Sequence, residues 1–267
     1  MVSIIIPYYN NEKTILETLQ SVFDQTYSNT EVILVNDGSL NDIYHIVKPY
    51  IESKKLIYLS QENKGVSTAR NYGAATAKGK YLLFLDADDL IDKDYVSKCV
   101  AVFQKDSEVK IVYCDALIFG RENKKWKLNE YQTFRDFLAS NCIFVSALLK
   151  KEDFDDVKGF DTSLDYYEDW ELWISILKNG GKVHKLREVL FFYRKNENES
   201  SSTDKADLDH KNEIRAKNRL KIYLKHYELY EKEFTNFEKI FLTYFRVIKK
   251  KEKMWYRNIF KNRYKRD

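Results

Sequence analysis

The chain is poor in the residues that break regular structure: its 267 residues include 8 Gly, 2 Pro and 3 Cys. So little glycine and proline excludes collagen-like and linker-rich architectures. The longest apolar runs, near 81–85 and 143–149, have the length of strands, whereas a bilayer span needs about 18 apolar residues. With 44% hydrophobic and 32% charged residues, we expect a soluble protein with one packed core and an appendage.

Features of export and of metal sites built from cysteine or histidine are also absent. The start, Val2-Ser3-Ile4-Ile5-Ile6 followed by Pro7, lacks the basic residues and the cleavage site of a secretory signal. The cysteines are odd in number and lack paired metal spacing, so we expect reduced, buried thiols in a reducing compartment. The histidines share no ligand or triad spacing and are interpreted as structural. These residues are Cys99, Cys114, Cys142, His45, His184, His210 and His226.

Positive charge is concentrated at the C-terminal end. Ten lysines and arginines lie between Arg246 and Arg266 against a single acid, Glu252, although the net charge of the whole chain is +4. Aromatic residues such as Trp255 and Phe260 alternate with these cations, which favours an interfacial helix on anionic lipid. RNA binding and a disordered solubilising end are the two alternatives. Because the basic balance is confined to one end, we expect no nucleic-acid-binding core.

The first third of the chain alternates strand-like and helix-like segments. Strands are predicted at 2–6, 31–35, 56–59 and 81–85, and helices at 15–23, 43–51 and 66–76, the first with Asn11 as its cap. Residues 81–85 lack polar alternation, as expected of a strand covered on both faces. The pattern predicts an α/β fold with a doubly wound, mostly parallel sheet.

Three of these strands end in polar clusters: Tyr8-Tyr9-Asn10, Asn36-Asp37-Gly38-Ser39 and Asp86-Ala87-Asp88-Asp89. Ligands of open α/β sheets lie outside the carboxyl ends of the strands, so we expect the clusters to converge on one site. Closely spaced carboxylates after a buried strand supply hard oxygen ligands, which suit Mg²⁺ or Mn²⁺. The alternative is that Asp88 and Asp89 only cap the next turn.

The second half of the sequence has a looser pattern. We expect a helix at 95–103, a strand at 110–113, a helix through Trp170 and Leu177 that ends at Gly180-Gly181, and a strand at 189–193. Residues 196–209 are polar and predicted to form a loop. The remainder, from Leu208 on, is predicted to form two or three helices.

Five motifs occur in order between Val2 and about Ser202. They are Pro7-Tyr8-Tyr9-Asn10, Asn36-Asp37-Gly38-Ser39, Asn63-Lys64-Gly65 with Ala69-Arg70-Asn71, Asp86-Ala87-Asp88-Asp89, and Gly159-Phe160-Asp161 leading to Glu168-Asp169-Trp170-Glu171-Leu172-Trp173. Each motif is weak alone, but five in this order are specific. With them the sequence resembles the family 2 inverting glycosyltransferases of GT-A fold.

The resemblance implies a UDP-sugar donor and assigns positions to it. Pro7 and Tyr9 would line the uracil pocket, and Asp37 would accept a hydrogen bond from the base. Simple core packing of Tyr8 and Tyr9, and a turn role for Asp37 before Gly38, are the alternatives.

The resemblance also implies residues for the diphosphate and the metal. Arg70 would lie near the base or diphosphate, Asp86 would touch the ribose or sugar, and Asp88 would hold Mn²⁺ or Mg²⁺. A surface ion pair is the alternative for Arg70.

Glu168-Asp169 begins a predicted helix, whose N-terminal dipole favours ionised carboxylates such as a general base. Adjacent helical residues point about 100° apart, so one of the two should face the acceptor. The resemblance selects Asp169 as the catalytic base and places Glu168 and Trp170 on the acceptor side. The alternative is that both acids only cap the helix.

The chain departs from the family pattern after its last predicted strand. Many relatives have Arg-x-His there, but the order here is Arg194-Lys195-Asn196. Because an amide is a weaker metal ligand than imidazole, we expect Arg194 and Lys195 to make diphosphate or lid contacts.

Together these features predict a GT-A domain at 1–203 and a helical, basic extension at 204–267. Within the domain, residues 1–115 would bind the nucleotide sugar and 116–203 the acceptor. The resemblance implies transfer of a sugar to a saccharide or lipid-linked saccharide at the cytoplasmic face of a membrane, in surface polysaccharide or glycolipid assembly. A sugar nucleotidyltransferase, which would need a Gly-rich loop after the first strand, and a non-catalytic nucleotide-sugar-binding protein are the alternatives.

Overall fold

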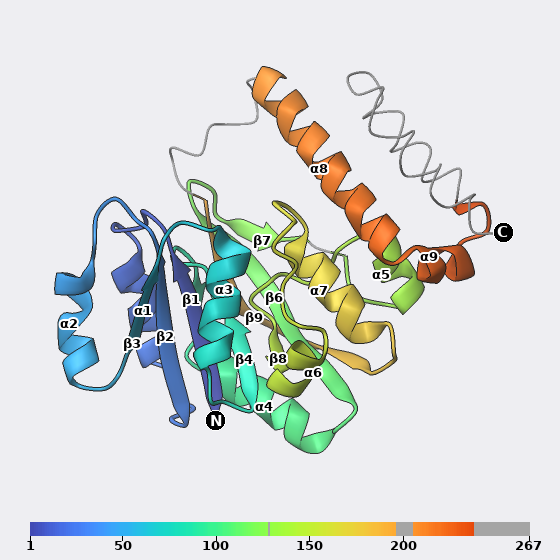
Figure 1. The fold of residues 1–267 in the computed structure, drawn as a ribbon. Coiled ribbons are helices and arrows are strands. Elements are labelled where there is room, and N and C mark those ends of the chain that lie inside the picture. Colours follow the sequence, from blue (N-terminus) through green and yellow to red (C-terminus); the bar gives the residue numbers. More distant parts are fainter. Residues whose placement is uncertain (128, 196–204, 238–267) are drawn as a thin grey trace. The chain divides into compact units, whose positions relative to one another are not determined.

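The computed structural model describes residues 1–127, 129–195 and 205–237 (Figure 1). Contacts divide the chain into two compact units, one of residues 1–163 and 168–199 and one of residues 164–167 and 200–267. The predicted lipid-binding segment at 246–266 and Asn196 lie outside the described residues, and the predicted division at residue 203 stays a prediction.

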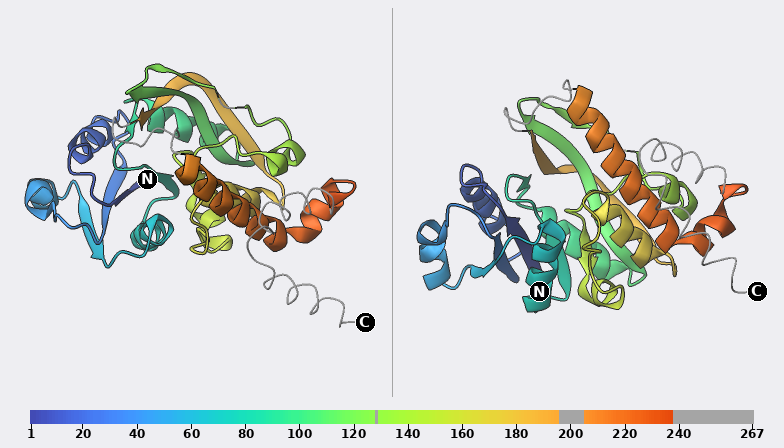
Figure 2. Two further views of the ribbon diagram at one scale, coloured as in Figure 1. Left: turned by 90° about the horizontal axis from the view of Figure 1, so that it is seen from above. Right: turned by 45° about the horizontal axis from the view of Figure 1, so that its top comes forward.

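The first unit begins with four parallel strands in the order β3-β2-β1-β4. Every residue of the central strand β1 is buried. Figure 2 shows α1 and α3 on opposite faces of these strands, which confirms the doubly wound pattern. The elements are β1 (Val2–Tyr8), α1 (Ile15–Phe23), β2 (Thr30–Asp37), α2 (Tyr44–Glu52), β3 (Ile57–Gln61), α3 (Val66–Thr76) and β4 (Tyr81–Phe84).

The sheet continues beyond β4 with mixed strand directions. β8 pairs antiparallel with β4 and with β6, and β6 runs parallel to the long strand β9, which carries β5 at its other edge. Short β7 pairs antiparallel with β6. The elements are β5 (Leu90–Ile91), α4 (Tyr95–Lys105), β6 (Val109–Gly120), β7 (Lys124–Trp126), α5 (Phe134–Ala139), β8 (Leu148–Lys150), α6 (Lys151–Asp156), α7 (Glu168–Leu177) and β9 (Lys182–Lys195).

Two local predictions were wrong. Helix α1 has Thr14, not Asn11, at its N-cap, because the backbone carbonyl of Asn11 accepts the N–H groups of Thr14 and Ile15 in a preceding turn. Residues 205–209 of the predicted polar loop belong to a helix, whereas 196–204 lie outside the described residues. The three cysteines are free and buried, as predicted.

The second unit contains α8 (Lys205–Lys225) and α9 (Tyr227–Glu233). Tyr223, Tyr230 and Phe237 pack ring against ring, with centroids 4.7–5.5 Å apart, and all three are buried. Among the described residues, no helix combines the length and the apolar character needed to cross a bilayer.

Helix α3 approaches the sheet at Gly73. A Cβ at this position would lie 2.5 Å from Cγ2 of Ile5 in β1 and 3.1 Å from Cγ2 of Val35 in β2. The glycine therefore allows the close approach of α3 to the sheet, one turn after Arg70.

We expect Gly73→Ala to lower the free energy of unfolding. Overpacking against buried side chains costs about 1–3 kcal/mol, which exceeds the gain of about 1 kcal/mol from better helix propensity. Chemical denaturation would measure this change, with Tyr72→Ala on the exposed face of α3 as the control. Equal or higher stability of Gly73→Ala would contradict the close approach.

Candidate active site

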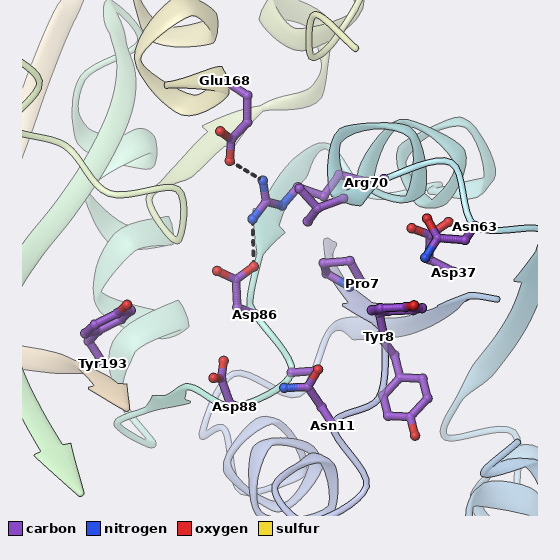
Figure 3. Close-up of a pocket in the computed structure, with 14 residues that line it drawn as sticks. Pro7, Tyr8, Asn11, Asp37, Asn63, Arg70, Asp86, Asp88, Glu168 and Tyr193 are labelled. Atoms are coloured by element: carbon purple, nitrogen blue, oxygen red, sulfur yellow. Dashed lines mark hydrogen bonds and ion pairs between the residues drawn. The ribbon is translucent and has the colours of Figure 1, made fainter. Parts of the chain in front are cut away.

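A cavity of about 560 Å³ opens at the carboxyl ends of the parallel strands (Figure 3). All three polar clusters that follow β1, β2 and β4 contribute to its wall, as the sequence predicted, together with α3 and the start of α7. Its lining residues are Pro7, Tyr8, Tyr9, Asn11, Asp37, Asn63, Gly65, Val66, Arg70, Asp86, Ala87, Asp88, Glu168 and Tyr193.

Asp37 at the end of β2 is held in place by the last residue of β3 and by the loop that follows it. Its Oδ1 accepts hydrogen bonds from Nε2 of Gln61, at 2.7 Å, and from the backbone N–H of Lys64, at 2.9 Å. Gly38 has a φ of +71°, and a Cβ there would lie 2.6 Å from the backbone N of Asn63. A glycine is therefore required for the two loops to meet beside Asp37.

Arg70 on α3 links two carboxylates across the cavity wall (Figure 3). Its guanidinium forms ion pairs with Asp86, at 2.7 Å, and with Glu168, at 2.9 Å, and its side chain is 3% exposed. Although burial disfavours the charge, these two carboxylates raise the pKa of Arg70 above its usual value. The predicted alternative of a surface ion pair is wrong, because the arginine is buried and its two ion pairs join α3, the end of β4 and α7.

The neighbouring Asn71 connects α3 to the motif at residues 159–161. Its Nδ2 donates to the backbone carbonyl of Phe160 and its Oδ1 accepts the N–H of the same residue, both at 2.9 Å. The Phe160 ring in turn lies under the Arg70 guanidinium, 5.3 Å from its Cζ. These contacts explain physically why the two motifs occur together.

The carboxylates after β4 differ in environment. The Asp88 side chain lines the cavity, whereas Asp89 is 1% exposed and accepts the backbone N–H of Arg194 at 2.8 Å. Burial, and then the charges of Asp86 and Asp88, raise the pKa of Asp89 well above its usual value.

Asp169 lies beside the cavity and is not part of its lining. Its carboxylate accepts a hydrogen bond from Nδ2 of Asn141, at 3.0 Å, and one from the backbone N–H of Trp170, at 2.6 Å. Burial, followed by the charge of Glu168, raises the pKa of Asp169 to about 7. The helix N-terminus was expected to favour the ionised form, but desolvation and the adjacent carboxylate outweigh it.

Three further predicted residues are also not part of the cavity lining. The Trp170 indole is fully buried and donates to the carbonyl of Phe137 at 2.8 Å. The Arg194 guanidinium donates to the carbonyl of Asp88, and Lys195 pairs with Glu122 at 3.2 Å. Their predicted contacts with an acceptor or a diphosphate stay predictions.

Tyr193 and Asn11 are lining residues that the sequence did not assign. Tyr193 lies near the end of β9, and the centroid of its ring is 4.8 Å from the ring centroid of Trp126. The signal that could have found it is its position at the end of a predicted strand, the same rule that located the other clusters. Asn11 had been interpreted as a helix cap.

The α/β sheet with a carboxylate-rich cavity at its strand ends matches solved glycosyltransferases of GT-A fold, and comparison with known proteins gives the family. The model of glycosyl transferase family 2 matches residues 3–158. The chain belongs to this family.

Curated relatives extend the similarity beyond the matched region. The chain is 29% identical over 218 residues to the uncharacterized glycosyltransferase RT0329 of Rickettsia typhi, covering 76% of this chain and 66% of the relative. It is 30% identical over 218 residues to the minor teichoic acid biosynthesis protein GgaB of Bacillus subtilis, covering 76% of this chain and 24% of the relative. The chain therefore spans less than two thirds of the length of either relative.

Solved structures share the fold. S. aureus TarS 1-349 in complex with UDP-GlcNAc aligns with a TM-score of 0.66 at 21% identity, covering 82% of this chain and 66% of that one. The mannosyltransferase PcManGT of Pyrobaculum calidifontis, in complex with GDP-Man and Mn²⁺, aligns with a TM-score of 0.62 at 20% identity, covering 85% and 64%.

Proposed function

We propose that this family 2 glycosyltransferase transfers a sugar from a UDP-sugar to an acceptor hydroxyl with inversion at the anomeric carbon. The observation that carries the proposal is that Asp37, Arg70, Asp86 and Asp88 line one cavity together with Glu168, the neighbour of Asp169 in the chain. Transfer from a nucleotide diphosphate sugar requires residues that bind the base, the charged diphosphate and the acceptor. The cavity wall carries candidate residues for these three in that order.

In this proposal the nucleotide lies along the strand ends. Pro7 and Tyr9 contact the uracil ring, and Asp37, held by Gln61 and Lys64, accepts the imide N–H of the base. Asp86 lies nearer to the ribose or sugar. Arg70 remains in its ion pairs and fixes the position of Asp86, because both carboxylates already engage its guanidinium.

The residues present fit a divalent cation that takes most of its ligands from the donor. Among residues 1–127, 129–195 and 205–237, no group of three or more His, Cys, Asp or Glu side chains is arranged to hold a metal. Asp88 lines the cavity with a hard oxygen donor, and the donor's diphosphate would supply further oxygens. Mn²⁺ or Mg²⁺ held there by Asp88 would neutralise charge on the departing UDP.

Asp169 is proposed as the general base. Its carboxylate removes the proton from the acceptor hydroxyl while that oxygen forms a bond to the anomeric carbon and the bond to UDP breaks. Attack from the face opposite to UDP inverts the configuration. A pKa of about 7 matches the requirement that a base be partly ionised near neutral pH and still bind a proton well.

The setting is proposed from the relatives and from composition. A relative named for minor teichoic acid biosynthesis supports a role in surface polysaccharide or glycolipid assembly, with a saccharide or lipid-linked saccharide as acceptor. The cations between Arg246 and Arg266 support peripheral attachment to the cytoplasmic face of an anionic membrane.

Release of UDP from a panel of UDP-sugars, with Mn²⁺, with Mg²⁺ and with chelator, tests the proposed function. We expect one donor to release UDP faster than the others, and only with metal. Pyrophosphate exchange with UTP would instead indicate a sugar nucleotidyltransferase. Donor binding without release of UDP, even with acceptors present, would indicate a non-catalytic protein.

The pH dependence of transfer follows from the raised pKa of Asp169. We expect kcat/KM to rise with pH through about 7, because the carboxyl is protonated and inactive below that value. In Asn141→Ala the rise should move to higher pH, since a donor that favours the ionised carboxylate is lost.

The free energy of unfolding, measured over the same pH range, controls for denaturation. A folded-state pKa above that of the unfolded chain means that Asp169 adds stability as pH falls below 7 and loses it as pH rises. Activity and this contribution to stability therefore change in opposite directions. A pH profile that is flat between 5 and 8 in a stable protein would contradict the assignment.

A further inference from the structure

Arg194 lies against the Asp86–Asp89 turn instead of facing the cavity. Its Nε donates to the backbone carbonyl of Asp88 at 2.7 Å, and its backbone N–H donates to Oδ1 of the buried Asp89 at 2.8 Å. Its guanidinium is 4.4 Å from the ring centroid of Phe119 and 2.5 Å from Glu17. With 14% of the side chain exposed, the arginine is packed on several sides.

The turn that presents Asp88 is held through three successive carbonyls. The carbonyl of Asp86 accepts the N–H of Asp89 at 3.1 Å, and that of Ala87 accepts the Thr14 hydroxyl at 3.0 Å. The third carbonyl, that of Asp88, accepts Nε of Arg194. Arg194 therefore acts on the backbone of the residue proposed to hold the metal.

We propose that Arg194 is a positioning residue that fixes the Asp88 carboxylate for a divalent cation bound together with the donor's diphosphate. This inference rests on the proposed function. It differs from the expected direct contact of Arg194 with the diphosphate, because Nε and Nη2 of the guanidinium are already engaged by the carbonyl of Asp88 and by Glu17.

The two roles of Arg194 predict different energetics. A direct diphosphate contact acts through charge, so its loss would weaken UDP binding with and without metal. A positioning role acts through Asp88, so its loss would weaken only the part of UDP binding that metal adds. Mutation of residues that orient metal ligands typically lowers metal affinity by about 10–100-fold.

Calorimetric titration of UDP, in Mn²⁺ and in chelator, would separate these roles in three variants of the chain. Arg194→Met removes every side-chain donor, leaves the backbone N–H that binds Asp89, and keeps an unbranched stem over Phe119. Arg194→Lys keeps the charge but replaces the planar fork, so one Nζ must replace two differently directed donors. Glu17→Gln is the matched control. It removes the ion pair between Arg194 and Glu17, whose side chain is 59% exposed, and leaves the hydrogen bond from Arg194 to Asp88 in place.

We expect Arg194→Met to reduce the gain in UDP affinity on adding Mn²⁺ by about 10–100-fold and to leave the affinity in chelator unchanged. Arg194→Lys should show most of the same loss and Glu17→Gln almost none, with the thermal midpoint recorded for each variant. Should Arg194→Met fail to fold, Arg194→Lys alone decides the question.

Equal losses with and without Mn²⁺ would overturn the inference in favour of a direct phosphate contact, and a full metal effect in both arginine variants would overturn it outright. In either case the proposed function would stand. If Mn²⁺ does not change UDP affinity even in the unmutated protein, the proposed metal use falls and the inference with it.

Discussion

Asp169→Asn is expected to bind UDP as the unmutated protein does and to lose sugar transfer by about 10²–10⁴-fold, the usual contribution of a general base. Asparagine preserves the size of the side chain and can still accept the backbone N–H of Trp170, but it cannot take a proton near neutral pH. The measurement is sugar transfer at saturating UDP-sugar, with UDP affinity determined separately.

Glu168→Gln is the matched control, because the two acids are adjacent and face different partners. Glu168 lines the cavity and pairs with Arg70, whereas Asp169 contacts Asn141. We expect the Gln variant to lose much less transfer, since its amide oxygen can still accept from Arg70. A greater loss in Glu168→Gln than in Asp169→Asn would make Glu168 the base and would leave family membership untouched.

The parallel half of the fold was predictable because its sequence pattern is local. Residues 66–76 were predicted as a helix with the observed bounds. The four strands were found at their observed places, three of them shorter by one to three residues and the fourth longer by one. Convergence of the polar clusters followed from one rule, that parallel strands end at the same edge of the sheet. This rule needs no knowledge of side-chain contacts.

The mixed half of the sheet carries too little local signal. β5 has two residues and β7 and β8 have three each, which is too short for a strand period to be recognised. These strands form because the long neighbours β6 and β9 offer them edges, and for β5 and β8 those neighbours lie far away in the chain.

The chemical state of the site residues was less predictable than their identity. The contact between Arg194 and Asp88 joins positions 106 apart, and nothing in either motif indicates it. The pKa of Asp169 depends on burial and on Glu168, both of which oppose the helix dipole on which the sequence argument relied. Motifs therefore located the cavity wall, and only packing showed which groups are already engaged.

Asp88→Ala is expected to abolish the increase in UDP affinity that Mn²⁺ or Mg²⁺ produces and to leave the fold intact. Asp88 lies on a turn whose backbone carbonyls bind Thr14 and Arg194, so removal of its carboxylate keeps those hydrogen bonds. The cation would then lose its protein carboxylate at the cavity wall. Calorimetry of UDP binding with metal and with chelator, beside thermal unfolding, measures both effects.

A control with the same change in charge separates coordination from general electrostatics. Asp24→Ala removes an exposed carboxylate at the end of α1, away from the cavity lining, and should keep the full metal effect. If Asp88→Ala and Asp24→Ala respond to metal alike, Asp88 does not hold the cation. A loss specific to Asp88→Ala, together with a metal-selective loss in Arg194→Met, would trace the metal effect from a ligand at the cavity wall to the arginine that holds its backbone.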